Sequence, residues 1–490
     1  MIAVSRLFDK EFVMNNVAQG EEPSPGFRLA DTFKRQQQSS RANPYMSYRQ
    51  RRRYLLQLAE LLTNNQDSIA EAISLDFGCR PRQETQLLEI FNLVSGIHFT
   101  LKHLKQWMKP QKRHVGLAFW GAKNLVIPQP KGVIGVIAPW NYPLFLSLSP
   151  CTSALAAGNR CLIKLAAKSQ RLAQLLDKLI QQAFDDDVLA VIPGVSATDF
   201  TSMPWDHLVF TGSPKTAESV MLAAAKNLTP LTLELGGKSP AIVAADFPVE
   251  LAAERLLLGK FLNAGQTCVA PDYVFIARDQ IDIWVETAKT ILKKRYPDVN
   301  SVDYTSIVDA EAYERLSVTL ADAVSKGARA INLLGSVRGD ERSRKFPPYL
   351  ILEAEDGMRI MQEEIFGPLM PVIPYDSMDE VINYINRHER PLALYLYSND
   401  RNLQQRIIYN TLSGGMCIND NVFHVAQHDM PFGGIGNSGM GQYHGREGFN
   451  EFSKLRPVFH QTRFSRIPLL APPYGHRFDT IFKLLLKLRR

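Results

Sequence analysis

The stretch Val133-Ile-Gly-Val-Ile-Ala138-Pro-Trp-Asn-Tyr-Pro143 sets the architecture of the 490-residue chain. Its first six residues predict a strand without polar alternation, and a helix is expected after Pro143. Similar apolar strands are predicted at 161–165, 188–192, 207–211 and 231–235. Leucines at helical spacing predict an amphipathic helix between the second and third of these five strands. Apolar strands separated by amphipathic helices are typical of a parallel sheet covered on both faces, so the sequence predicts an α/β fold.

The alternation of strands and helices continues in a second unit beyond Gly237. Its strands are predicted at 241–245, 273–277, 370–375, 392–397 and 415–418. Before the first unit, residues 27–109 show helical periodicity, and residues 124–132 carry two prolines at alternate positions, which suits an edge strand or an arm. A chain of this length is expected to divide, and the sequence predicts two α/β domains with a cleft between them.

The composition is that of an ordinary globular protein, with 45% apolar and 21% charged residues. The net charge of +7 raises the question of a nucleic-acid partner, but the basic runs are short and lack interleaved aromatic residues, which favours solvated helix faces. Five scattered cysteines argue against a disulfide framework or a structural zinc site and favour a reducing, cytoplasmic setting. The N-terminus has no signal-peptide pattern, and no window of about 18 apolar residues would span a bilayer, so a soluble protein is expected.

One cysteine occupies a position suited to chemistry. In Asn263-Ala-Gly-Gln-Thr-Cys268 an apolar helical run ends, and the thiol follows on a short turn before the strand at 273–277. Functional groups gather on such connections, because a rigid scaffold presents them at the surface. A lone cysteine is nevertheless more often a small buried hydrophobic residue, so this position alone does not decide between the two interpretations.

A candidate phosphate site follows the strand at 207–211. Gly212 is followed by Ser213, which suits a helix cap, and by Pro214, which suits the first helical position. The unpaired N–H groups of a helix N-terminus suit a pyrophosphate, although a plain strand-to-helix turn is the alternative. The literal G-x-G-x-x-G match at 434–439 is rejected as a dinucleotide turn, because no strand precedes it and no βαβ unit follows it.

Three further groups lie at predicted strand ends or turns. Asn141 lies between prolines directly after a strand, where its amide can donate to an oxyanion, although a proline-bounded turn is the alternative. Glu234 ends an apolar strand, and a carboxylate there is either paired or functional because unpaired burial is costly. The segment 363–368 places two glutamates and a phenylalanine at a turn, a composition that by itself fits any loop.

In their order along the chain, five motifs resemble the aldehyde dehydrogenase superfamily. The motifs are Phe210-Thr-Gly-Ser213, Leu233-Glu-Leu-Gly-Gly-Lys-Ser-Pro240, Asn263-Ala-Gly-Gln-Thr-Cys268, Glu363-Glu-Ile-Phe-Gly-Pro368 and Pro431-Phe-Gly-Gly434. The likeness covers the chain from about Phe27 to Arg456. It is greatest to the class 3 branch and, within that branch, to the coniferyl aldehyde dehydrogenase group.

The resemblance implies NAD(P)-dependent oxidation of an aldehyde to the carboxylic acid. The substrate would be aromatic, such as coniferyl aldehyde, or a medium- to long-chain aliphatic aldehyde. Cys268 would be the nucleophile, forming a thiohemiacetal and then a thioester. The Asn141 amide and the Cys268 backbone N–H would hold the oxyanion, and Glu234 would be the general base for hydrolysis.

The resemblance also implies a cofactor site and no metal site. The positions are Lys164 at the adenosine ribose, Gly212 and Ser213 at the pyrophosphate, Trp140 in the same region, Glu364 at the nicotinamide ribose and Phe366 near the nicotinamide. The chain departs from the family pattern at Ala167, where a carboxylate commonly joins the lysine on the ribose. Its absence removes a group that would repel a 2′-phosphate, and Lys168 adds positive charge, so use of NADP alongside NAD is expected.

With these roles, the sequence predicts a Rossmann-like parallel-sheet cofactor domain, a second α/β catalytic domain and a small β oligomerisation arm. The predicted bounds are a loose N-terminal extension at 1–25, the dinucleotide-binding domain at 26–120 and 133–237, the catalytic domain at 238–430, the arm at 121–132 and 443–465, and a C-terminal tail at 466–490. The likeness of the arm to the family's bridging elements implies a homodimer. The basic, apolar tail is expected to pack on the protein's own surface rather than on a membrane.

Two rival functions remain. A CoA-acylating aldehyde dehydrogenase would use a thiol in place of water, but relatives of that kind commonly lack the glutamate that Glu234 matches. A non-catalytic structural protein on the same fold would require none of Cys268, Glu234, Asn141 and Lys164, so their joint presence disfavours it.

Overall fold

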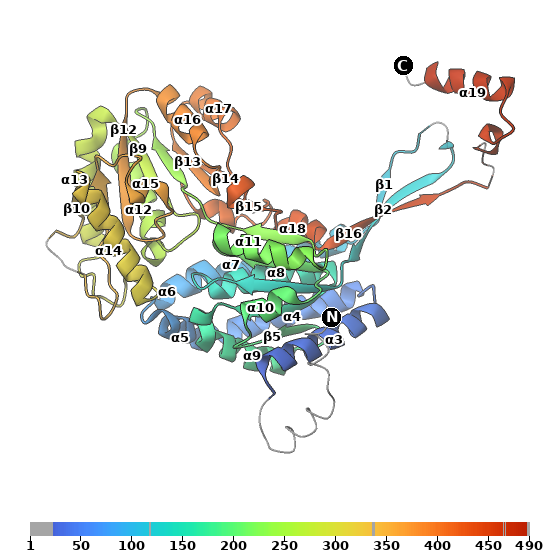
Figure 1. Ribbon diagram of the computed structural model, residues 1–490, viewed down its shortest axis with the longest axis horizontal. Helices are drawn as coiled ribbons and strands as arrows, with labels where there is room; N and C mark the ends of the chain where they lie inside the picture. Colours follow the sequence, from blue (N-terminus) through green and yellow to red (C-terminus); the bar gives the residue numbers. More distant parts are fainter. Residues whose placement is uncertain (1–22, 117–118, 336–338, 464, 466, 488–490) are drawn as a thin grey trace.

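The computed structural model describes residues 23–116, 119–335, 339–463, 465 and 467–487. Within these residues the strands form three sheets, which Figure 1 shows as two lobes and a projecting arm. The first lobe is built on the sheet β15-β7-β6-β3-β4-β5, and the second lobe on the sheet β10-β11-β12-β9-β8-β13-β14. The arm is the sheet β1-β2-β16. The predicted α/β fold is confirmed.

The first lobe has a parallel core with one antiparallel edge strand. Its parallel strands are β3 (Val133–Ala138), β4 (Arg160–Leu165), β5 (Leu189–Val191), β6 (His207–Thr211) and β7 (Leu231–Glu234). The two-residue strand β15 (Gly439–Met440) runs antiparallel to β7 and places Gly439 opposite Glu234. Every residue of β3, β4 and β6 is buried, which explains why these strands lack polar alternation.

Helices cover the first sheet on both faces (Figure 1). They are α3 (Pro25–Ala42), α4 (Tyr48–Asn64), α5 (Gln66–Phe77), α6 (Arg82–Thr85), the π-helical turn η2 (Gln86–Phe91), α7 (Asn92–Trp107), α8 (Pro143–Ala157), the 3₁₀ turn η4 (Ala167–Ser169), α9 (Gln170–Ala183), α10 (Ala197–Ser202), α11 (Pro214–Ala225) and α18 (Gly445–Glu451). Helix α8 is buried along its whole length, because it lies between the sheet and α4 and α7.

The second lobe is also mainly parallel. Its strands are β8 (Pro240–Val243), β9 (Tyr273–Ala277), β10 (Arg329–Asn332), β11 (Tyr349–Leu352), β12 (Leu369–Tyr375), β13 (Ala393–Tyr397) and β14 (Gly415–Ile418), and its helices are α12 (Val249–Phe261), α13 (Ile281–Arg295), α14 (Ala310–Ser325), α15 (Arg359–Gln362), α16 (Met378–Arg387) and α17 (Arg401–Asn410). Only β10, which pairs antiparallel with β11, breaks the parallel pattern among these strands. The sequence did not predict β10 and β11, two four-residue strands at the sheet edge.

The arm joins two segments that are far apart in the chain. Strand β2 (Lys123–Pro130) pairs antiparallel with β16 (Ser453–His460) and, over residues 124–126, with β1 (Gln111–Arg113). The prolines of β2 lie beyond the part that β1 covers, as expected of residues without a backbone N–H. The predicted arm segment 443–465 is wrong in its first part, because α18 packs on α7 and α8 and buries Phe449.

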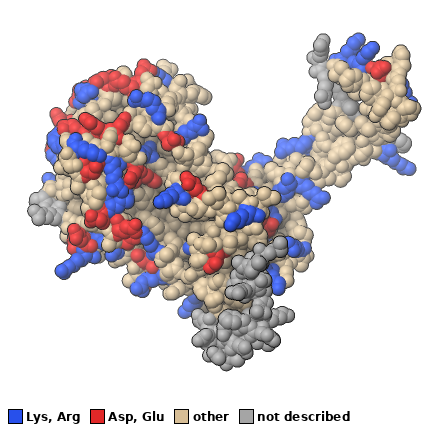
Figure 2. Space-filling view, in the orientation of Figure 1, with Lys and Arg blue, Asp and Glu red and all other residues tan. Residues whose placement is uncertain are grey.

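The tail does not pack on the body of the protein, so that prediction is wrong. After a 3₁₀ turn (Ile467–Leu470), helix α19 (His476–Lys487) lies at the far end of the arm, and none of its residues is buried (Figure 1). Figure 2 shows basic side chains around this end, whereas acidic and basic side chains are interspersed over both lobes. Of the loose N-terminal extension predicted at 1–25, residues 1–22 lie outside the described residues, and α3 begins at Pro25. No helix in the described part of the chain is long and apolar enough to cross a bilayer.

Candidate active site

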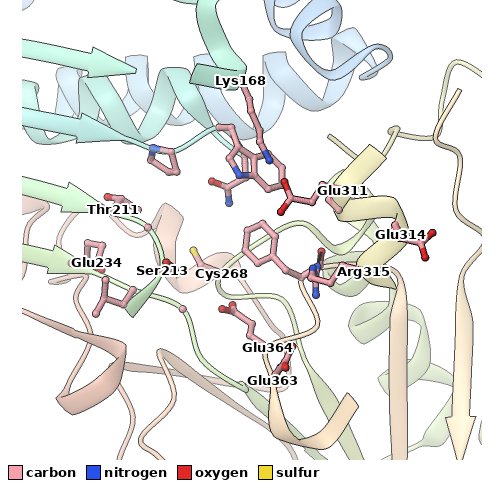
Figure 3. A pocket seen from close by; sticks show the side chains of 18 of the residues that line it. Lys168, Thr211, Ser213, Glu234, Cys268, Glu311, Glu314, Arg315, Glu363 and Glu364 are labelled. Atoms are coloured by element: carbon pink, nitrogen blue, oxygen red, sulfur yellow. Dashed lines mark hydrogen bonds between the residues drawn. The ribbon is translucent and has the colours of Figure 1, made fainter. Parts of the chain in front are cut away.

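A cleft of about 650 Å³ lies where the two lobes meet, at the carboxyl ends of β3, β6 and β7. Eight of the nine predicted site residues line it: Asn141, Trp140, Gly212, Ser213, Glu234, Cys268, Glu364 and Phe366. Figure 3 shows Cys268 between Ser213 and Glu234 of the first lobe and Arg315 and Glu364 of the second. The structure therefore brings together side chains that are more than 200 residues apart in the chain.

Lys164 is the predicted residue that does not line the cleft. Its side chain is buried on β4, where Nζ donates to the Leu165 carbonyl at 3.2 Å, and burial lowers its pKa. Lys168 lines the cleft instead, from η4. Its ammonium pairs with Asp309 of the second lobe and lies 5.9 Å from the centre of the Trp140 indole ring. Lys168, rather than Lys164, thus places a positive charge in the cleft beside Trp140.

The candidate phosphate site is a helix N-terminus open to the cleft. Ser213 caps α11, because its Oγ accepts the Thr216 N–H at 3.3 Å, and Pro214 is the first helical residue. Gly212 leaves room for the chain to enter the helix, since a Cβ there would lie 2.5 Å from the Phe210 ring. Pro214 has no N–H, and the Thr216 and Ala217 N–H groups bind Ser213, so the Lys215 N–H is the first-turn donor left for an anion in the cleft.

The thiol turn is held in an unusual backbone conformation. After α12 ends at Phe261, three successive residues have left-handed φ angles: Asn263 (53°), Ala264 (51°) and Gly265 (74°). A side chain at Gly265 would collide with the protein backbone, because a Cβ would lie 2.3 Å from the Gly367 carbonyl oxygen. Such strain persists only where the surroundings fix the backbone, and it is typical of active sites.

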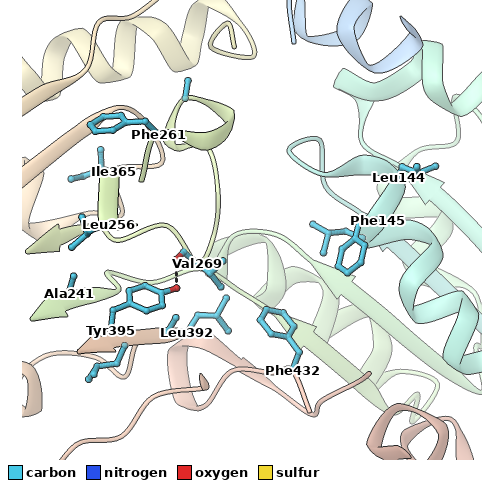
Figure 4. Close-up of a cluster of buried hydrophobic side chains, with 14 of the residues drawn as sticks. Leu144, Phe145, Ala241, Leu256, Phe261, Val269, Ile365, Leu392, Tyr395 and Phe432 are labelled. Carbon is cyan, nitrogen blue, oxygen red and sulfur yellow. Dashed lines mark hydrogen bonds between the residues drawn. The ribbon is translucent and has the colours of Figure 1, made fainter. Parts of the chain in front are cut away.

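Two buried side chains fix the turn from either side. The Gln266 amide donates to the carbonyls of Asn263 (3.0 Å) and Ser306 (3.1 Å) and accepts the Val308 N–H at 2.9 Å. On the other side of the thiol, the Tyr395 hydroxyl donates to the Val269 carbonyl, as the dashed line in Figure 4 shows. Because Gln266 and Tyr395 are both fully buried, the turn that carries Cys268 has little freedom to move.

Asn141 lies against the same turn. Its side-chain Nδ2 donates to the Gln266 backbone carbonyl at 3.3 Å. Its backbone carbonyl accepts from Asn263 Nδ2 at 3.2 Å and from Arg80 Nη1 at 3.3 Å. Only 3% of the residue is exposed. A fixed amide donor beside a thiol is an arrangement that stabilises a developing oxyanion.

Glu234 and Cys268 both carry perturbed pKa values. Glu234 is 2% exposed, and neither carboxyl oxygen has a hydrogen-bond partner among the described residues, so burial raises its pKa well above the usual value. Burial, followed by the charges of Glu364 and Glu234, raises the pKa of Cys268 to about 12. Buried titratable groups of this kind in a cleft are typical of catalytic residues.

Alkylation of Cys268 by iodoacetamide in the cofactor-free protein is expected to be slow at pH 7. Its rate should rise about tenfold per pH unit up to about pH 10, because the thiolate is the reactive form and its fraction grows tenfold per unit below the pKa. Mass spectrometry of the Cys268 peptide measures this rate separately from that of the other thiols. A rate that levels off below about pH 8 would show that the resting thiol is already activated.

A second cavity, of about 240 Å³, reaches Cys268 and is almost entirely apolar. Its lining includes Leu87, Leu88, Phe91, Tyr142, Phe145, Leu146, Leu262, Val269, Val422, Phe423, Val425, Ala426 and Phe432. The hydroxyls of Tyr142 and Thr267, also in this lining, bond to each other at 2.6 Å. Among the residues that the structure describes, Cys268 alone lines both cavities.

The sequence did not indicate the residues of α14 that line the second-lobe side of the cleft. They include Glu311, Glu314 and Arg315, which lie on an ordinary amphipathic helix and carry no recognisable motif. Arg315 Nη2 donates to the Ile365 carbonyl at 2.8 Å, beside Glu364. Burial, and secondarily Asp272, raises the pKa of Glu364 to about 8. No group of three or more His, Cys, Asp or Glu side chains in the described part of the chain could hold a metal ion.

Comparison with known proteins agrees with this geometry. Residues 30–458 match the sequence profile of the Aldehyde dehydrogenase family. The chain is 46% identical over 464 residues to a probable coniferyl aldehyde dehydrogenase of Pseudomonas aeruginosa, covering 94% of this chain and 96% of that protein. It resembles the substrate-bound structure of Staphylococcus aureus AldH with a TM-score of 0.87 at 34% identity, covering 93% and 99% of the two chains. It also resembles Mycobacterium tuberculosis aldehyde dehydrogenase complexed with NAD+ with a TM-score of 0.77 at 26% identity, covering 86% of each chain.

The matched region contains both lobes, the thiol turn and most of the arm, so the likeness extends over the whole catalytic assembly rather than one motif. The P. aeruginosa relative also matches over nearly its full length. The chain therefore belongs to the aldehyde dehydrogenase family.

Proposed function

We propose that the protein oxidises an apolar aldehyde to the carboxylic acid with NAD(P)+ as hydride acceptor. The observation that carries this proposal is the position of Cys268. It lines both the polar cleft and the apolar cavity, whose other lining residues differ. A nucleophile at the junction of two cavities can meet a cofactor and an aldehyde together. In this proposal the first lobe binds the cofactor and the second lobe carries the nucleophile.

The cleft fits a dinucleotide. Its volume lies in the range of about 300–1,000 Å³ usual for ligand sites, and the N-terminus of α11 offers the Lys215 N–H to a pyrophosphate. The rings of Trp140 and Phe366 meet edge to face at 5.4 Å within the lining. Gly236 allows Glu364 to lie against the cleft wall, since a Cβ there would be 1.9 Å from the carboxylate. When bound, NAD(P)+ would supply the acceptor for the hydride of the aldehyde.

The chain's own residues account for the other steps. Cys268 gives up its thiol proton to water in the cleft and its Sγ bonds to the carbonyl carbon, while the carbonyl oxygen accepts from Asn141 Nδ2 and the Cys268 N–H. After the carbon is oxidised, a thioester remains on the sulfur. Glu234 then accepts a proton from the water that attacks the thioester, and the C–S bond breaks to release the acid. Burial raises the pKa of Glu234, so its carboxylate form is a stronger base towards a water molecule that reaches it.

The apolar cavity favours a substrate with a long apolar tail. In a panel of straight-chain aldehydes, kcat/KM is expected to rise about fourfold per methylene until the cavity is filled, because each buried CH₂ contributes about 0.8 kcal/mol. Coniferyl aldehyde, the substrate named for the P. aeruginosa relative, belongs in the same panel. Initial rates of NADH formation measure the series, and a flat chain-length profile would contradict the assignment of this cavity to the aldehyde.

The same assay decides the cofactor preference. Residue 167 is an alanine in η4, and the neighbouring Lys168 lines the cleft. With no carboxylate at 167 to repel a 2′-phosphate, we expect activity with NADP+ as well as NAD+. Activity with NAD+ alone would contradict this expectation, and Ala167→Glu should lower kcat/KM for NADP+ more than for NAD+.

The arm supports a homodimer. Strand β16 is exposed along most of its length, and its Phe459 is 49% exposed, so the arm presents an edge and apolar side chains that a second copy could cover. Light scattering of the eluted protein is expected to give about twice the 55.2 kDa of one chain. A mass near that of one chain would contradict the dimer.

We also place the protein in a reducing, cytoplasmic compartment. All five cysteines are free thiols in the structure, including the nucleophile. Recovery of the protein outside the cytoplasmic fraction of its native cells would contradict this placement.

A further inference from the structure

A buried ionic cluster lies behind Asn141 and lines neither cavity. It consists of Arg80, Glu84 and Glu89. The side chains of Arg80 and Glu89 are 0% exposed, and Arg80 Nη1 donates to Glu89 Oε1 at 2.6 Å. We propose, on the basis of the function proposed above, that Glu89 is a positioning residue that sets the place of the oxyanion donor Asn141.

Arg80 binds Asn141 itself, and Glu89 binds the residues that follow it in the chain. The second carboxyl oxygen of Glu89 accepts the N–H groups of Leu144 (2.8 Å) and Phe145 (3.0 Å), in the first turn of α8. The cap residue of α8 makes no side-chain capping bond, so Glu89 satisfies these donors. Arg80 Nη1, which binds Glu89, also donates to the Asn141 carbonyl at 3.3 Å. The π-helical turn η2 places Glu89 at this point.

Glu84 extends the cluster to the thiol turn. Its Oε1 accepts the Asn263 N–H at 3.2 Å, its Oε2 accepts the Thr305 hydroxyl at 2.7 Å, and the Arg80 Nε lies 4.0 Å from Oε2. The guanidinium thus lies between one carboxylate bound to the Asn141 segment and another bound to the Cys268 turn. The two oxyanion donors come from these two segments, so the cluster sets the spacing between them.

Fold stability alone does not account for the fully buried pair Arg80–Glu89 with Glu84, 11% exposed, beside it. Burial of charged groups is costly, and apolar residues of similar volume stabilise a core as well or better. Apolar side chains, however, cannot present two acceptor oxygens in fixed directions, which Glu89 does towards Arg80 and towards α8. The catalytic requirement is strict, because a misplacement of about 1 Å can cost about 100-fold in rate.

Glu89→Gln tests the proposal. The amide keeps one acceptor oxygen, so either Arg80 or the first turn of α8 loses its partner. We expect kcat to fall about 10- to 100-fold while the Kd for NADH, measured by its fluorescence, stays within about twofold of the wild-type value. The decisive measurement is the double variant with Asn141→Ala. If Glu89 acts through Asn141, Glu89→Gln should change kcat by less than about twofold in that background.

Asp246→Asn is the control. The Asp246 carboxylate, which is exposed, likewise accepts two backbone N–H groups, from Asn399 (2.7 Å) and Asp400 (3.0 Å), but it lies beyond the end of β8 opposite to the cleft. This variant should lower the Tm and leave kcat unchanged, which separates a loss of stability from a loss of positioning.

Two results would overturn the proposal: an unchanged kcat in folded Glu89→Gln, or a loss of the same size in the presence and absence of Asn141. If Glu89→Gln does not fold, Arg80→Lys is judged by the same double-variant criterion, since lysine keeps the charge without the guanidinium fork. Failure of the proposed function itself is distinguishable, because the wild type would then form no NADH with any aldehyde of the panel.

Discussion

Cys268→Ala is expected to lower aldehyde-dependent NADH formation by at least about 10⁴-fold, because loss of the nucleophile removes the covalent route. The effect should fall on kcat, since the polar cleft is otherwise intact and the thiol is one residue among its many lining groups. NADH binding, measured by fluorescence titration, should therefore be retained. Activity within about tenfold of the wild type would exclude Cys268 as the nucleophile.

Cys417→Ala provides the control for this variant. Cys417 is also a half-buried thiol of the second lobe, on β14, where its Sγ lies 3.3 Å from His424 Nδ1. It lines neither the cleft nor the apolar cavity. Its removal should leave kcat unchanged, so a loss confined to Cys268→Ala is a loss of chemistry rather than of a thiol in general.

Glu234→Gln is expected to block hydrolysis and to spare the first half of the reaction. Loss of a general base costs about 10²- to 10⁴-fold, and that loss should appear in the steady-state rate. Because thioester formation does not need Glu234, rapid mixing should still show a burst of NADH approaching one equivalent per subunit. Stopped-flow absorbance at the NADH band measures the burst and the later rate together.

Added hydroxylamine provides the control for Glu234→Gln. A strong nucleophile needs less help from a base, so it should raise the steady-state rate of the variant by a larger factor than that of the wild type. An absent burst would place Glu234 before the thioester and contradict its assignment. A wild type that turns over only with CoA would instead favour the CoA-acylating alternative.

The sequence predicted most of the fold because most strands of the two sheets are buried on both faces. Strand β3 is apolar throughout and β6 has an apolar centre, and such runs are typical of buried strands. The structure adds β10 and β11, whose four-residue runs are too short to recognise as strands, and no residue of β10 is fully buried. The tail was mispredicted because periodicity reveals an apolar helical face in α19 and says nothing about what covers it.

Site residues that belong to a sequence motif were predictable. Residues that meet only in the folded structure were not. Cys268 and Asn141 follow a predicted helix or strand end, Glu234 lies at a strand end, and the structure places all three at the cleft. Lys164 instead lies on β4, where its Nζ binds the Leu165 carbonyl, and Lys168, four residues later in η4, lines the cleft. The partners of Arg80 could not be foreseen, because its contacts to Glu89 and Asn141 arise only after α8 packs on η2.

The pairing of β2 with β16 has a consequence for the synthesis of the protein. The two strands are separated by 322 residues, from Pro130 to Ser453. Strand β15 likewise pairs with β7 only after the chain has passed through the second lobe. At about 5–20 residues per second, a ribosome needs roughly 15 to 65 s to make the intervening chain. During that interval β2 emerges without its long partner, so this pairing of the arm forms only after β16 has been made. An assembly that depends on the arm is thereby confined to chains already extended past β16.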